Sequence, residues 1–160
     1  MIRNLNSTRT VFTLAAALII AAVSPAQAPT SRINVSDEQR AQLHEIVARV
    51  LSHAEQVGCK PDHCKVLVTN FADHDGNTSN LGMQLAEEAG RDEAFTTNHI
   101  QVVPHSMLEN YLENERIPSK SLREIESTRW LAGEFSANAA LIGRIESKDG
   151  KLMLELQLVQ

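Results

Sequence analysis

The chain has 160 residues, of which 42% are hydrophobic and 22% are charged, and its formal net charge is −5. This composition is ordinary for a globular protein and excludes an intrinsically disordered chain, a collagen-like repeat and a disulfide-dense scaffold. Two cysteines cannot form a zinc-finger cluster by themselves. The one long apolar run lies near the N-terminus, which excludes a membrane protein with several spans.

The first 28 residues have the layout of a secretory signal peptide. Arg3 and Arg9 give a positive start, an apolar run covers 11–23, and an A-x-A cleavage site ends at Ala28. The run is shorter than the roughly 20 residues that a membrane-spanning helix needs. We therefore expect cleavage after Ala28 and a periplasmic or secreted location. Retention of the segment as an N-terminal anchor is the alternative.

Cleavage makes the rest of the chain strongly acidic. It leaves about 132 residues and removes two arginines but no acid, so 13 basic residues stand against 20 acidic ones and the net charge becomes −7. A domain with that charge lacks the basic footprint that nucleic-acid binding needs, and it is equally ill suited to docking on anionic lipid. We expect no nucleic-acid partner and no integral membrane span after cleavage.

An amphipathic helix is predicted over 37–57, within a leader of residues 29–65. Ser36 and Gln39 have the spacing of a capping box, and Gly58 is placed to end the helix. The apolar residues between them recur at steps of three and four: Leu43, Ile46, Val47, Val50, Leu51, Ala54 and Val57.

Residues 66–160 alternate between strand-like and helix-like patterns. Asp149-Gly150 is a strong signal for a two-residue hairpin turn. The alternation predicts an α/β fold, with a mixed, mainly parallel sheet of about four strands packed with helices and a C-terminal β-hairpin. The predicted strands are 66–71, 100–103, 139–145 and 152–159, and the predicted helices begin after Ser79, at Pro104 and near Leu122.

These elements also carry a family resemblance. In chain order, the matching segments are 66–71, 75–79, 81–88, 100–103, 137–146 and the final hairpin. Together they resemble the TolB N-terminal-like domain, in the broad group of periplasmic α/β modules that includes the FlgO and CsgG relatives. The resemblance implies a periplasmic α/β domain over 66–160 and offers no catalytic residues. Some secreted bacterial chains of this kind continue into a TonB-type C-terminal domain.

Cys59 and Cys64 are expected to form a disulfide, because export places them in an oxidising compartment. The bond would join the end of the first helix to the start of the first strand. Two alternatives are a redox-active pair, although the spacing is not C-x-x-C, and a metal site that includes His63.

A short acidic loop supplies weak candidates for ligand binding, namely Asp73, Asp75 and Asn77. The loop lies between a strand end and a helix start, where α/β sheets commonly bind ligands. It is not an EF-hand, because Thr78 and Gln84 stand where the glycine and the bidentate glutamate are required. Turn and capping chemistry is the simpler interpretation.

Catalytic motifs are missing from the sequence. There is no G-x-S-x-G, no P-loop and no G-x-G-x-x-G. His44-Glu45 lacks the second histidine of a zinc motif, since Ala48 occupies that position. His105 lies near a predicted helix start, outside any of these motifs. Trp130 and Phe135 are expected in the core, with a ligand platform as the alternative. We expect no catalytic residues, no metal and no cofactor.

The sequence thus predicts a non-enzymatic α/β domain that mediates protein interactions in the bacterial cell envelope, with envelope proteins as partners. It predicts neither the partner nor the oligomeric state. Two alternatives remain. The chain stops at Gln160 directly after strand-like sequence, which favours the N-terminal module of a TonB-type energy transducer or envelope assembly protein. The loop 73–79 together with His105 would instead serve a small-ligand-binding or hydrolytic domain.

Overall fold

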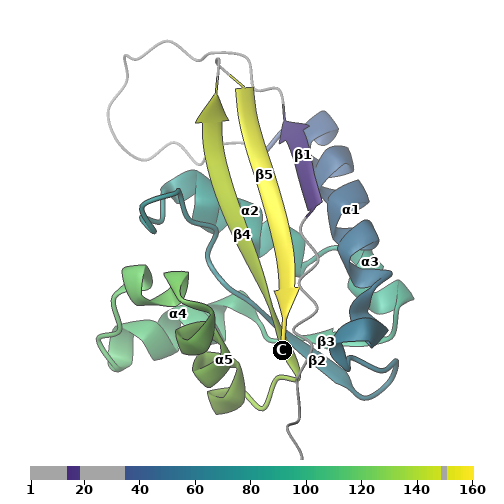
Figure 1. Cartoon of the computed structure of the whole chain (residues 1–160), viewed down its shortest axis with the longest axis vertical. Coiled ribbons are helices and arrows are strands. Elements are labelled where there is room, and N and C mark those ends of the chain that lie inside the picture. The colour runs from purple at the N-terminus through teal and green to yellow at the C-terminus, as the bar shows by residue number, and fades with distance from the viewer. Residues whose placement is uncertain (1–13, 19–34, 149–150) are drawn as a thin grey trace, which may run out of the picture.

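A central sheet organises the protein. The computed structural model describes residues 14–18, 35–148 and 151–160. Over these residues the sheet has five strands in the order β1-β5-β4-β2-β3 (Figure 1). The strands are β1 (Leu14–Leu18), β2 (Cys64–Val68), β3 (Ile100–Val102), β4 (Ala139–Lys148) and β5 (Lys151–Val159).

Helices cover both faces of this sheet. They are α1 (Asp37–Leu51), α2 (Asn80–Gly90), α3 (Glu93–Thr97), α4 (His105–Asn114) and α5 (Ile125–Glu134), with the 3-10 turns η1 (Ala54–Val57) and η2 (Ser119–Arg123). In the part of the chain that the structure describes, no helix combines the length and the apolar character needed to cross a bilayer.

The strand pairing confirms the predicted α/β fold class. The central strand β2 runs parallel to both β3 and β4. β4 and β5 form the C-terminal antiparallel hairpin, paired from Ala140 opposite Val159 to Lys148 opposite Lys151. The four predicted strands are therefore the four strands β2 to β5, and the mixed sheet follows from two parallel and two antiparallel pairings.

The strand β1 comes from the segment that has the layout of a signal peptide. It pairs antiparallel with β5 at the sheet edge, with Leu14 opposite Leu156 and Leu18 opposite Leu152. Ala28 and the expected cleavage site lie outside the described residues. Cleavage of the segment stays a prediction, and it concerns the same five residues that form this strand.

The first helix is shorter than its apolar pattern predicts. Its capping box is present, because Gln39 N–H donates to the Ser36 hydroxyl (3.2 Å) and Ser36 N–H donates to the Gln39 side chain (2.8 Å). The α-helix ends at Leu51 and not at residue 57. Ser52 and His53 both direct side chains to the carbonyl of Arg49, at 2.7 and 3.0 Å, and such bonds compete with continuation of the helix.

Two hydrophobic cores lie on opposite faces of the sheet. The first lies under α1, α2 and α3, and α1 contributes to it together with β2 and β5, so the predicted leader shares one core with the rest of the domain. The second lies under α4 and α5. Figure 1 shows α4 and α5 on one side of the strands and α1 and α3 on the other. Adjacent residues of β4 divide between them: Leu141 belongs to the first core and Ala140 to the second.

A glycine sets how closely α2 approaches the end of β2. Gly82 lies in the first turn of α2, which Ser79 caps at 3.1 Å. A Cβ at Gly82 would lie 2.1 Å from the carbonyl oxygen of Phe71. Only glycine permits this approach without a shift of the backbone. Glycine has a low helix propensity, but the packing that positions the loop after β2 requires it at position 82.

Candidate functional site

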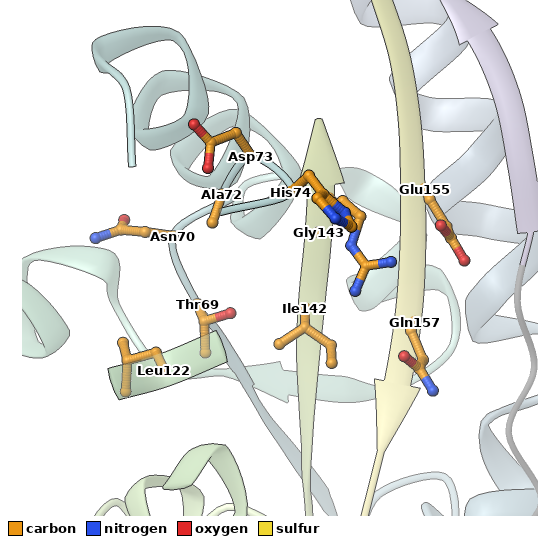
Figure 2. Close-up of a pocket in the computed structure, with 11 residues that line it drawn as sticks. Thr69, Asn70, Ala72, Asp73, His74, Leu122, Ile142, Gly143, Glu155 and Gln157 are labelled. Atoms are coloured by element: carbon orange, nitrogen blue, oxygen red, sulfur yellow. The ribbon is translucent and has the colours of Figure 1, made fainter. Parts of the chain in front are cut away.

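A polar crevice of about 90 Å³ opens at the carboxyl end of β2. It lies between the neighbouring strands β2 and β4. From β2 the chain crosses to β3 on one side, and from β3 it crosses back to β4 on the other side of β2. Such a switch point is where open α/β sheets bind ligands. Figure 2 shows the residues that border it, among them Thr69 and Asn70 after β2, Ile142 and Gly143 on β4, and Glu155 and Gln157 on β5.

The acidic loop beside this crevice is held together by Asp73. Its carboxylate accepts the N–H of Asp75 (2.9 Å), the N–H of Asn77 (2.8 Å) and the side-chain amide of Asn77 (3.2 Å). These bonds, with the backbone bond from Asn77 the largest contribution, lower the pKa of Asp73 below its ordinary value. The carboxylate is therefore engaged in the turn.

The structure places the three predicted ligand residues in different surroundings. Asp73 borders the crevice, whereas the side chains of Asp75 and Asn77 are exposed on the loop. Among the described residues, no group of three histidine, cysteine or acidic side chains is arranged to hold a metal ion. The hydrogen bonds of Asp73 lie within the turn, and ligand binding by the loop stays a prediction.

A network that sequence reasoning missed joins β2 to α4. His105 Nε2 lies 2.7 Å from Asn70 Oδ1, and Asn70 Nδ2 donates to Glu109 Oε1 at 2.7 Å. With the amide in this orientation, Nε2 of His105 carries the proton and donates. Asn70 is only 7% exposed, so its amide is a buried polar connection between the strand end and the helix. The network brings His105 to Asn70 and not to the acidic loop.

Two further polar features of the crevice are a bonded hydroxyl and a pair of opposite charges. The Thr69 hydroxyl donates to the carbonyl of Leu141 at 3.3 Å. Arg144 and Glu155 are cross-strand partners on β4 and β5, and opposite charges in such positions attract one another. The crevice can therefore hold a few water molecules or a small polar group.

The two cysteines form a disulfide in the structure, with their Cα atoms 4.9 Å apart. Both residues are buried. The bond links the segment after η1 to Cys64, the first residue of β2. This pairing uses both sulfur atoms, and the neighbouring His63 is exposed.

An aromatic group lies on the outside of α4 and α5. The Tyr111 ring packs between Trp130, with ring centroids 6.5 Å apart, and Phe135, with centroids 5.3 Å apart in an edge arrangement. Trp130 is nevertheless 51% exposed, and Met107, one turn before Tyr111, is 52% exposed. The expectation that Trp130 lies in the core is wrong. The inward positions of α5 are taken by Thr128, Leu131 and Ala132.

Acidic residues surround this aromatic group. Glu126 and Glu134 lie four residues before and after Trp130, which places them on the same side of α5. The Tyr111 hydroxyl donates to Glu134 at 3.4 Å. Burial, followed by the negative charges of Glu134 and Glu115, raises the pKa of Tyr111. We call Met107, Tyr111 and Trp130, with these three glutamates, the aromatic surface.

Comparisons with known proteins give one structural likeness. No family model matches the chain, and no curated protein matches it. Among solved structures, the chain is similar to the LpoB C-terminal domain from Salmonella enterica, with a TM-score of 0.49 and 13% sequence identity, over 72% of this chain and 85% of that one. The resemblance to TolB N-terminal-like domains stays a prediction.

Proposed function

We propose that this chain is an exported, non-enzymatic domain that binds another protein in the bacterial cell envelope. The observation that carries the proposal is the aromatic surface, where Trp130 and Met107 are about half exposed and the Tyr111 ring contacts that of Trp130. Binding of a partner would cover the exposed tryptophan.

The residue types of this surface support that role. Tryptophan, tyrosine and methionine are enriched at the centres of protein interfaces, and tryptophan and tyrosine are frequent hot spots. The contact with Tyr111 restrains the Trp130 ring before binding, so less side-chain entropy is lost when a partner arrives. The glutamates of the aromatic surface, of which Glu126 also pairs with Arg129 at 3.3 Å, favour a partner whose apolar cleft is bordered by lysine or arginine.

The polar crevice supports a non-enzymatic role because several of its polar side chains are hydrogen-bonded within the fold. Asp73 organises its own loop, Asn70 joins β2 to α4, and the Thr69 hydroxyl bonds a strand carbonyl. Each of these groups already has a partner within the fold. We therefore assign the crevice to the stability of the strand end and the binding function to the aromatic surface.

Two features support export. The first 28 residues have the layout of a cleavable signal peptide. The buried disulfide between Cys59 and Cys64 is of the kind that persists in oxidising compartments such as the periplasm. The acidic charge of the mature chain disfavours nucleic acid and anionic lipid as partners and so supports a protein partner in the envelope.

Affinity capture from an envelope extract tests the proposal. The tagged chain, Trp130→Ala and the control Glu55→Ala, which lies at an exposed position of η1, would be compared at equal amounts. Specific partners should be recovered by the first and third chains and fall about tenfold or more with Trp130→Ala, as for an interface hot spot. Circular dichroism would confirm that all three chains are folded. Equal recovery by all three chains would contradict the proposed surface.

A further inference from the structure

We propose that the outer edge of β5 is a second binding site, which takes an extended apolar segment of a partner protein as an added antiparallel strand. The inference rests on the export and signal cleavage proposed above, and it concerns a surface different from the one that carries Trp130. Figure 1 shows β5 between β4 and the short strand β1.

The strand that now occupies this edge belongs to the segment expected to be removed. β1 comprises Leu14–Leu18, and cleavage after Ala28 takes it away together with the rest of the signal peptide. The five β5 residues from Leu152 to Leu156 then lose their antiparallel partners. In the processed chain, β5 would be the edge of the sheet, with a row of unpaired N–H and C=O groups.

The edge is also strongly apolar on one face. Leu154 and Leu156 are completely buried in the present arrangement and belong to the core under α1. α1 contacts both β1 and β5, so removal of β1 opens a slot between the helix and the strand. A long edge strand bordered by apolar side chains is a template for strand addition unless something covers it.

The present occupant indicates the chemistry of the partner segment. The paired sequence is Leu-Ala-Ala-Ala-Leu, five uncharged residues running antiparallel to β5. A charged residue in the middle of such a segment would be brought against the apolar slot beside Leu154, at a high desolvation cost. We therefore infer an uncharged, extended segment rich in alanine and leucine, held by main-chain hydrogen bonds in the manner of β-augmentation.

A second copy of this chain fits the edge less well. Because α1 contacts both β1 and β5, a two-fold pairing of β5 with its own copy would bring a second α1 over the same pair of strand positions. Two helices cannot share that space, since helix axes pack no closer than roughly 8 Å. A partner segment without a covering helix avoids this conflict.

Peptide binding to the processed chain tests the inference. Protein exported and cleaved by the cell would be purified, and its intact mass would establish the new N-terminus. A fluorescent peptide carrying Leu-Ala-Ala-Ala-Leu between neutral hydrophilic ends would be titrated and followed by anisotropy, with a scrambled peptide carrying a central aspartate as the control. Saturable binding of the first peptide alone is expected, and Trp130→Ala should bind it equally well.

Backbone methylation then identifies the mode of binding. Alternate N–H groups of a strand point to opposite sides. One peptide would be N-methylated at the two leucines and the middle alanine, and a second at the other two alanines. The two peptides should differ in affinity. One set should lose about tenfold or more in affinity and the other should bind nearly as the parent. The proposal is overturned by an intact mass that retains residues 14–18, by no binding, by equal effects of both methylation sets, or by a dimer that excludes the peptide.

Discussion

The ring of Phe71 lies against the backbone of Gly143. A Cβ at position 143 would be 2.3 Å from Cδ1 of that ring, and the ring is fully buried. The next residue, Ala72, donates its N–H to the Gly143 carbonyl at 3.0 Å. This contact fixes the chain after β2 against the middle of β4, and so it fixes the start of the acidic loop.

Replacement Gly143→Ala should destabilise the fold. The added methyl group has to displace a buried aromatic ring, and overpacking of this kind typically costs about 1–3 kcal/mol. Urea unfolding followed by circular dichroism gives the free energy of unfolding. The matched control is Gly133→Ala in α5, where nothing lies within 4 Å of the added Cβ. This control should be neutral or stabilising by about 0.5–1 kcal/mol, and equal losses in the two variants would refute the packing argument.

Replacement Asn70→Ala should weaken the connection between β2 and α4. It removes the side chain to which both His105 and Glu109 bond, and the loss of a buried polar bridge costs about 1–3 kcal/mol. The control is Asn110→Ala, at an exposed position of α4. It should change the free energy of unfolding by less than about 0.5 kcal/mol. An Asn70→Ala variant as stable as the Asn110→Ala control would show that the network is not structural.

The acidic loop should contribute to stability in a pH-dependent way. Asp73 has a lowered pKa in the folded chain, because Asn77 and Asp75 bond its carboxylate. A lowered folded-state pKa gives a contribution that is present above the unfolded pKa and lost as pH falls through the folded value. Between about pH 6 and about pH 3, Asp73→Asn should therefore lose less stability than the parent chain. Asp75→Asn serves as the control and should follow the parent, and an unchanged acid profile in Asp73→Asn would contradict this role.

The disulfide should be present in exported protein and should stabilise the fold modestly. Mass spectrometry of a non-reduced digest should find Cys59 joined to Cys64. The replacement of both by serine should cost about 2 kcal/mol in the chain-entropy model, because the closed loop is short. Recovery of two free thiols from protein purified under non-reducing conditions would contradict the prediction.

The fold class could be predicted because the strand patterns and the main start and turn signals agreed with the tertiary structure. The capping box at Ser36 and the turn signal at Asp149-Gly150 mark the first helix and the final hairpin. The end of the first helix could not be placed, since Ala54 and Val57 are buried in a 3-10 turn as they would be in a continued helix. The helix α3 is only five residues long and gave no periodic signal.

The sites were harder to predict because they depend on contacts between distant residues. Asn70 and His105 are 35 positions apart and meet only because β2 ends and α4 begins at the same side of the sheet. Trp130 was assigned to the core on its hydrophobicity alone. Glu126, Trp130 and Glu134 recur at steps of four on the side of α5 turned away from the buried Thr128 and Ala132. This spacing is the signal that could have found the aromatic surface.

Photo-crosslinking in intact cells tests the central claim most directly. A photoreactive phenylalanine analogue would replace Trp130 in one chain and Glu55 in a second. The turn η1, which carries Glu55, packs into the core on the other face of the sheet from α5. The account predicts a discrete crosslinked envelope protein from position 130 and none of that species from position 55. The same crosslinked species from both positions, or none from position 130 in a folded and exported chain, would contradict it.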